Sequence, residues 1–256
     1  MGLFRTEALV LRTVDFSEST QIAHFYSPDR GKFSAIAKGV KRFKSRLGPR
    51  LEAFAQVQAS VYAKEGAALG TLSSLELLRD WPYLRADLGR HALAALVFES
   101  IDRGTEEGKP GPDLYRLAVC FLEELGAAGD PQSLAAHALL RVLCLLGFAP
   151  DLREPEERGG PGAARGALFF LPDQGRLSTA SPADPRLPRL ALDGPSRAFL
   201  RQSMGLRAEE FAAFAAPPGL GRPLLAFLIR LFQFYVETDL KSARFLRRMI
   251  WEKSQG

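Results

Sequence analysis

Basic side chains gather between positions 30 and 50, and their chemistry is that of phosphate binding. The stretch holds eight lysines and arginines and no aspartate or glutamate. The eight are Arg30, Lys32, Lys38, Lys41, Arg42, Lys44, Arg46 and Arg50. Each cation that neutralises a phosphate releases a counterion, which favours binding without reading the base sequence. All eight are therefore candidate contacts to a DNA backbone, and the alternative is a solvated surface loop.

Two aromatic residues accompany this basic stretch. Proteins that bind single strands stack bases on aromatic rings, and each base contributes about 1–3 kcal/mol. Phe43 lies inside the run and is a candidate stacking residue, although its position suits an exposed loop equally well. Phe33 lies near the start of the run, and we expect it to face a hydrophobic core.

The net charge of +5 belongs entirely to the first 60 residues. These carry ten lysines and arginines against five aspartates and glutamates, whereas the remaining residues carry 24 of each sign. A local excess of positive charge attracts polyanions.

A second basic run, Lys241, Arg244, Arg247 and Arg248, lies near the C-terminus. In a helix, Lys241, Arg244 and Arg248 share one face. Such a face suits an acidic, hydrophobic peptide or more DNA backbone. The pattern alone slightly favours a third interpretation, in which the charges complement the dipole of their own helix.

Signatures of catalysis are missing from the sequence. It contains no Gly-x-x-x-x-Gly-Lys-[Ser/Thr] phosphate loop and no Gly-x-Ser-x-Gly nucleophile elbow. The histidines, His24, His91 and His137, are too scattered to form a zinc pair, and no acidic cluster suits two metal ions. We therefore expect a protein that is not an enzyme and that binds no cofactor or metal.

Short strands are predicted for the segment that carries the basic stretch. The predicted strands are 7–14, 21–26, 32–38, 52–64 and 71–78. The turn from Ser27 to Gly31 predicts a hairpin between the second and third strands. The mixed parity of the fourth predicts a bulge or a strong twist. Five short strands without helical periodicity suggest a small closed barrel, because closure removes exposed edges.

Helical periodicity begins after Trp81-Pro82. Apolar stripes predict helices around 93–101, 114–125 and 224–235, and the segment 134–146 is apolar nearly all round, so it should be the most buried helix. Residues 151–195 are rich in proline and glycine and predict an irregular insertion with room for one hairpin. The expected fold is α+β, with a barrel domain at 1–80 and a helical domain at 81–256.

The cellular compartment is inferred from what the chain lacks. No signal peptide or membrane span is evident. Cys120 and Cys144 lie in apolar helical runs, which predicts buried free thiols and a reducing compartment. We expect a cytoplasmic protein.

Three blocks, in order along the chain, resemble the RecO family of bacterial recombination mediators. The first includes Thr6 to Arg12, Ala37 to Gly39 and Leu51 to Phe54. The second runs from Leu143 to Leu152, and the third from Lys241 to Leu246. The resemblance implies an N-terminal OB-fold followed by a helical domain.

The same resemblance implies function and partners. It implies binding of single- and double-stranded DNA, annealing of complementary strands, and loading of RecA without ATP onto DNA coated by single-strand binding protein. The implied partners are RecR and the acidic C-terminal tail of single-strand binding protein. Candidate residues for that tail are Arg141, Arg230, Lys241, Arg244 and Arg248. The alternative is an OB-fold adaptor whose basic loop docks an acidic protein instead of DNA.

One feature departs from the family pattern. Many RecO relatives hold zinc through two Cys-x-x-Cys pairs within the insertion. Here Pro155 and Arg158 stand at the first pair, and Ser178 and Ser181 stand at the second. These residues cannot hold zinc. The insertion should therefore be a degenerate, zinc-finger-like module ordered by a small core around 168–171.

Overall fold

The computed structural model describes residues 2–41, 51–64, 69–155, 168–206, 210 and 219–252. The chain divides into two compact units, Met1–Leu122 and Glu123–Gly256, and each is described by itself. Strands give way to helices between Arg79 and Tyr83. The first unit extends beyond this point to Leu122, because the helices that follow pack on the strands.

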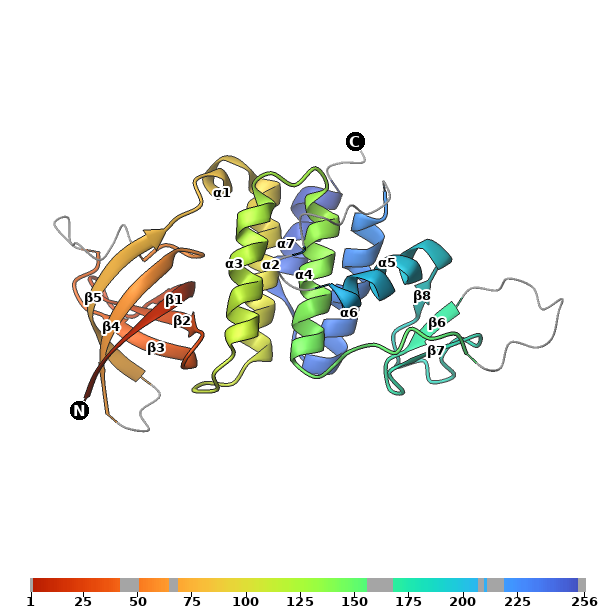
Figure 1. The fold of residues 1–256 in the computed structure, drawn as a ribbon, viewed down its shortest axis with the longest axis horizontal. Coiled ribbons are helices and arrows are strands. Elements are labelled where there is room, and N and C mark those ends of the chain that lie inside the picture. The colour runs from red at the N-terminus through yellow and green to blue at the C-terminus, as the bar shows by residue number, and fades with distance from the viewer. Residues whose placement is uncertain are drawn as a thin grey trace. The chain divides into compact units, whose positions relative to one another are not determined.

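The first unit begins with five strands, as predicted (Figure 1). They are β1 (Gly2–Asp15), β2 (Gln21–Ser27), β3 (Gly31–Ala37), β4 (Gln56–Ala63) and β5 (Leu69–Arg79). Hydrogen bonds join them in the order β1-β2-β3-β5-β4, and β4 pairs back with β1 to close a barrel. The β2–β3 hairpin is confirmed, and the irregularity predicted for the fourth strand appears as two register shifts between β4 and β5.

Small side chains fill the inside of the barrel. Strand alternation sends every second residue inward, and the inward residues are mainly alanine and valine, all fully or almost fully buried. They include Ala8, Val10, Ala23, Ala35, Ala37, Val57, Ala59 and Val61. Phe33 packs against this core, as expected, and its ring stacks on Phe25 at 5.1 Å. Phe4 continues the series, with its centroid 5.7 Å from that of Phe33.

Two longer helices complete the first unit. After the short α1 (Tyr83–Ala86) come α2 (Leu88–Gly104) and α3 (Pro112–Leu125), whose last three residues belong to the second unit. The carboxylate of Asp87 caps α2 by accepting a hydrogen bond from the Arg90 backbone N–H. The apolar stripes predicted for both helices are buried. Figure 1 shows α2 and α3 beside the barrel.

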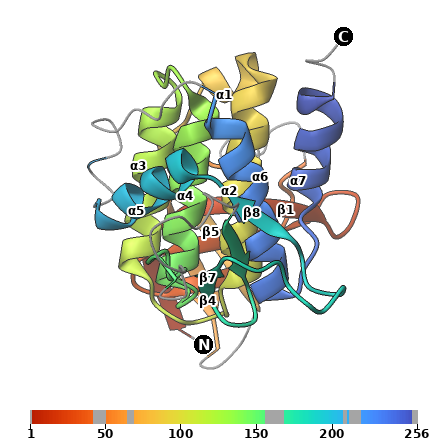
Figure 2. The ribbon, with the colours of Figure 1, turned by 90° about the vertical axis from the view of Figure 1, so that its right-hand side faces the viewer.

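The second unit holds the remaining helices. They are α4 (Pro131–Leu145), α5 (Gly194–Gly205), α6 (Gly221–Val236), α7 (Lys241–Phe245) and the π-helical η3 (Leu246–Trp251). As predicted, α4 is deeply buried, and it packs against α6 and α5. Figure 2 shows α5 running across α4. Ser133 and Asp130 lie so close to Gly221 that a side chain there would meet them, which explains the close approach of α6 to α4.

The insertion is more regular than predicted. It contains an antiparallel sheet in the order β7-β6-β8, formed by β6 (Leu168–Leu171), β7 (Arg176–Ser178) and β8 (Leu190–Leu192). The hairpin and its apolar core were expected, but the third strand was missed, and the unit is therefore not all helical. At three residues, β8 is too short to show an alternating pattern. No helix within the described ranges is long and apolar enough to cross a membrane.

The β2–β3 turn depends on a glycine in contact with the loop after α2. Gly31 has φ +62°, and a Cβ there would lie 1.8 Å from the backbone oxygen of Lys109. We expect Gly31→Ala to lower the free energy of unfolding by about 3 kcal/mol, since it adds a clash to the backbone strain. Gly108 also has positive φ but open space around it, so Gly108→Ala should cost about 1 kcal/mol. Equal losses in urea denaturation would disprove the contact.

Candidate nucleic-acid interface

The described basic residues of the 30–50 stretch fall into two groups. Arg30 and Lys32 lie at the start of β3, whereas Lys38 and Lys41 follow its end. Five strand residues separate Lys32 from Lys38, which is a span of roughly 20 Å at the usual rise. The other predicted contacts, Arg42, Phe43, Lys44, Arg46 and Arg50, lie outside the described residues. One continuous patch of described cations is therefore not formed.

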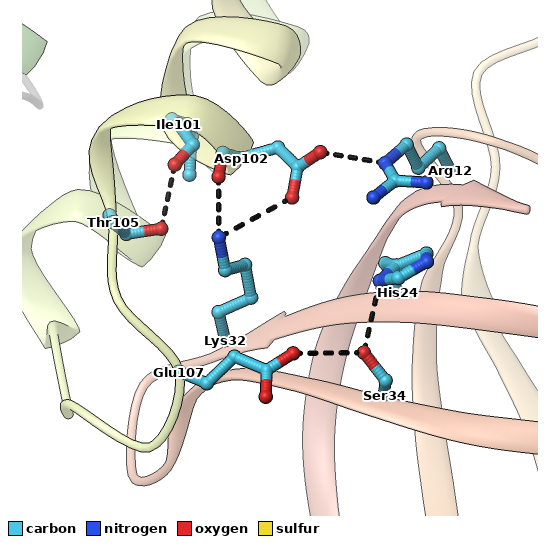
Figure 3. Close-up of polar contacts among 8 residues, drawn as sticks. All are labelled: Arg12, His24, Lys32, Ser34, Ile101, Asp102, Thr105 and Glu107. Carbon is cyan, nitrogen blue, oxygen red and sulfur yellow. Dashed lines mark hydrogen bonds and ion pairs between the residues drawn. The ribbon is translucent and has the colours of Figure 1, made fainter. Parts of the chain in front are cut away.

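Lys32 is held by the end of α2 (Figure 3). Its ammonium donates to the backbone oxygen of Asp102 at 2.5 Å and lies 3.6 Å from a carboxylate oxygen of the same residue. The Lys32 side chain is only 14% exposed. Lys32 is therefore a poor candidate for DNA contact, because its charge is already neutralised by Asp102 and the side chain is mostly shielded from solvent.

Arg30 also has a partner within the protein. Its guanidinium carbon lies 3.9 Å from the centre of the Phe4 ring, which is the geometry of a cation–π contact. Phe4 packs against the barrel core. Arg30 thus lies over Phe4, the last of the three stacked or edge-on rings Phe25, Phe33 and Phe4, although Arg30 itself remains exposed.

A polar row lies beside Lys32 on the outer face of the barrel. Arg12 donates from Nε to Asp102 at 2.7 Å. His24, its cross-strand partner, shares a 2.9 Å hydrogen bond with Ser34, which donates to Glu107 at 3.2 Å (Figure 3). Burial, reinforced by the charge of Arg12, lowers the pKa of His24. The end of α2 and its following loop therefore cover this row.

The opposite end of the barrel is more open. Lys38 is exposed, and the Lys41 ammonium lies 2.7 Å from the Asp15 carboxylate. The Lys41 backbone N–H also donates to the Ser19 carbonyl at 3.4 Å. The hydrogen bond from Lys41 is the main cause of a lowered Asp15 pKa. The basic stretch is thus tied, where it begins to leave β3, to the turn between β1 and β2.

Sequence reasoning missed an aromatic residue at this end. Phe16 in the β1–β2 turn is 65% exposed. Phe16 was not among the predicted contacts because it lies outside the basic run. Its position between the predicted strands 7–14 and 21–26 does indicate a turn, where a side chain is often exposed.

The basic candidates of the second unit differ in their surroundings. Arg141 donates from Nη1 to the Met204 carbonyl near the end of α5, at 3.0 Å. Lys241, Arg244 and Arg248 are exposed along α7 and η3, and share one side of the helix. Arg244 pairs with Asp239 at 3.0 Å. Arg230 is exposed on α6.

Comparison with known proteins identifies the family. A model described as "Recombination protein O N terminal" matches residues 1–81, and "Recombination protein O C terminal" matches residues 85–244. The chain belongs to the RecO family. The DNA repair protein RecO of Pelobacter propionicus is 30% identical over 96% of both chains. That of Anaeromyxobacter sp. (strain K) is 32% identical over 96% of both chains. This RecO family member is therefore a protein of DNA repair and recombination.

The residues at the zinc positions of some RecO relatives have other roles here. Ser178 is buried in β7, and its hydroxyl accepts a hydrogen bond from the Ala180 backbone N–H. Pro155 is buried and offers no ligand atom, and Arg158 lies outside the described residues. These residues do not fit a zinc ion.

A cavity of about 240 Å³ opens beside the start of α1 in the first unit. Its lining includes Trp81, whose indole donates to the Phe54 carbonyl at 3.2 Å. Arg85, which also lines the cavity, forms ion pairs with two other lining residues, Glu52 at 2.6 Å and Asp80 at 2.8 Å. Because the guanidinium is already neutralised by two carboxylates, the cavity offers no phosphate site.

Asp102 should be essential to the first unit's stability. Asp102→Asn would leave the mostly buried Lys32 ammonium without its counter-charge, and we expect a loss of about 3 kcal/mol in the free energy of unfolding. Glu76→Gln is a matched control, because it breaks an ion pair with Arg5 in which both side chains are about two-thirds exposed. It should cost less than about 0.5 kcal/mol. Similar small losses for both variants in urea denaturation would contradict the assignment.

Proposed function

We propose that this protein binds single- and double-stranded DNA, anneals complementary strands and helps to load RecA onto DNA coated by single-strand binding protein. Membership of the RecO family and its role in DNA repair support this. The single observation that carries the DNA contact is the excess of cations that begins at the exposed Lys38 and continues through Arg50 without a carboxylate. Such a run favours sequence-independent backbone binding.

We also assign the N-terminal barrel to the OB-fold. The strand order β1-β2-β3-β5-β4 and the small, filled interior support the assignment. An OB-fold binds oligonucleotides on its outer face and through its loops. Mediation without ATP fits the lack of a phosphate-loop motif in the sequence, so we propose a role without catalysis. RecR is the proposed partner, and the cytoplasm, at the nucleoid, is the proposed location.

Salt dependence tests the DNA contact. We expect charge reversal of Lys38, Lys41, Arg42, Lys44 and Arg46 together to weaken single-strand binding strongly. The slope of log K against log salt should flatten by about 0.7 for each lost phosphate contact. The measurement is fluorescence anisotropy with a labelled mixed-sequence oligonucleotide at several salt concentrations.

Lys109→Glu provides the control for this experiment. Lys109 is exposed in the same unit and pairs with Glu106 at 2.7 Å, but it lies against the other end of β3, beside Gly31. Its reversal should leave the slope unchanged. If the wild-type protein fails to bind the oligonucleotide even at low salt, the adaptor alternative replaces DNA binding.

The helix formed by α7 and η3 is our proposed site for the acidic tail of single-strand binding protein. Phe245, 39% exposed, lies among Lys241, Arg244 and Arg248 on one side of the helix. An apolar side chain between cations suits a peptide that is acidic with an apolar tip. Arg141 is less suitable, because it is already bonded to the Met204 carbonyl.

A peptide titration tests this site. We expect the triple variant Lys241→Glu, Arg244→Glu and Arg248→Glu to bind a labelled tail peptide at least about tenfold more weakly, since like charges repel. Arg201→Glu, which changes an exposed arginine on α5, should bind as the wild type does. Equal affinities for both variants would remove the α7–η3 site.

A further inference from the structure

The cavity beside the start of α1 has aromatic and aliphatic walls. Phe54 and Leu84 are almost fully buried, and Trp81 is partly exposed. The Phe54 ring lies edge-on to the imidazole of His91, with the two centroids 5.3 Å apart. The cavity's volume of about 240 Å³ is below the roughly 300–1,000 Å³ of small-molecule sites. It therefore suits a single large side chain.

The backbone of Phe54 fixes the shape of this cavity. Phe54 has φ +73°, a conformation that is costly for a bulky residue. Its N–H donates to the Val10 carbonyl at 2.8 Å, and the Val10 N–H donates to the Ala55 carbonyl at 2.9 Å. In this conformation the Phe54 carbonyl accepts the hydrogen bond of the Trp81 indole. The wall is therefore formed before a ligand binds, which lowers the entropic cost of binding.

The charged residues that line the cavity do not balance. Two carboxylates, Glu52 and Asp80, share the single guanidinium of Arg85, and their side chains are 56% and 42% exposed. A carboxylate offers about four acceptor positions, so each can accept a further donor. Arg79 lies 5.5 Å from the Trp81 ring but is outside the described lining. That lining thus carries one excess negative charge, which favours a cation.

Exposed aliphatic side chains extend the apolar surface beyond the cavity. Leu77, which lines it, is 39% exposed, and Leu88, one turn before His91 on α2, is 56% exposed. Exposed apolar groups that lie together mark a protein contact. A small cation would leave both leucines in water, whereas a polypeptide segment would cover them.

We propose that this cavity docks a partner protein that inserts an arginine side chain, carried by a segment with aliphatic neighbours. Arginine combines an apolar stem with a planar cation. The stem fits the walls formed by Trp81 and Leu84, and the guanidinium fits the acceptor positions of Glu52 and Asp80. DNA and acidic peptides are both excluded by the surplus of carboxylate, so this surface is separate from the contacts proposed above.

Two matched peptides test the cation. One has the sequence Gly-Leu-Arg-Leu-Gly, and the other carries citrulline, a neutral isostere, in place of arginine. The measurement is a nuclear magnetic resonance titration of the full ¹⁵N-labelled chain that follows the indole N–H of Trp81. The arginine peptide should shift this signal, and the citrulline peptide should bind about tenfold more weakly. The chain's other tryptophan, Trp251, is almost fully buried in the second unit, and its signal should not move.

Variants of the exposed ion pairs locate the binding site. Glu52→Gln and Asp80→Asn should each weaken binding of the arginine peptide about two- to fivefold. Arg85→Gln should strengthen it, because both carboxylates lose their competing cation. Asp113→Asn is the matched control, since it changes an exposed carboxylate paired with an arginine in the first turn of α3. It should leave the affinity unchanged.

Several outcomes would overturn the proposal. The first is an unmoved Trp81 signal, and the second is equal affinity for the two peptides. If arginine amide alone binds as tightly as the peptide, the cavity is a site for a small cation. If the protein self-associates in sedimentation and Glu52→Gln abolishes this, the occupant is a second copy of the chain. None of these results changes the oligonucleotide measurements, so DNA binding stands or fails separately.

Discussion

The buried carboxylate of Asp102 joins the first helices to the barrel. It lies in the last turn of α2, where the helix dipole disfavours negative charge. Two cations from the barrel reverse this penalty. Arg12 binds the carboxylate, and Lys32 binds both it and the free carbonyl of the same residue. The helix end is thus stabilised only when it lies on the barrel, which makes docking specific as well as favourable.

This docking divides the basic residues by role. At the start of β3, Lys32 neutralises Asp102 and Arg30 lies over the Phe4 ring. Both side chains therefore stabilise the fold. Lys38 follows the end of the same strand and is exposed. Among the described cations of the stretch, those at the start of β3 therefore have partners within the protein, whereas Lys38 presents its charge to solvent. A count of basic residues does not reveal this difference.

The strands and the principal helices could be predicted because their signals are local. Alternation and turn residues indicated β2 and β3, and the apolar stripe of α3 is buried as expected. The role of Lys32 could not be predicted, because Asp102 is 70 residues away and nothing in the sequence marks the pair. The exposure of Phe16 could not be predicted either, because the burial of a turn residue depends on the elements that pack around it. Local sequence patterns identify strands and helices, whereas tertiary contacts decide which partner a charged side chain binds.

The filled interior determines where a ligand can bind. The described side chains inside the barrel, mainly alanines and valines, are fully or almost fully buried, so a ligand would bind on the outside of the barrel. The polar row of the outer face is taken by Asp102 and Glu107. The β1–β2 turn is exposed at Phe16, and the Lys41 backbone N–H donates to Ser19 of that turn. A phosphate chain that contacts Lys41 would therefore lie near this turn, because the Lys41 backbone is hydrogen-bonded to it.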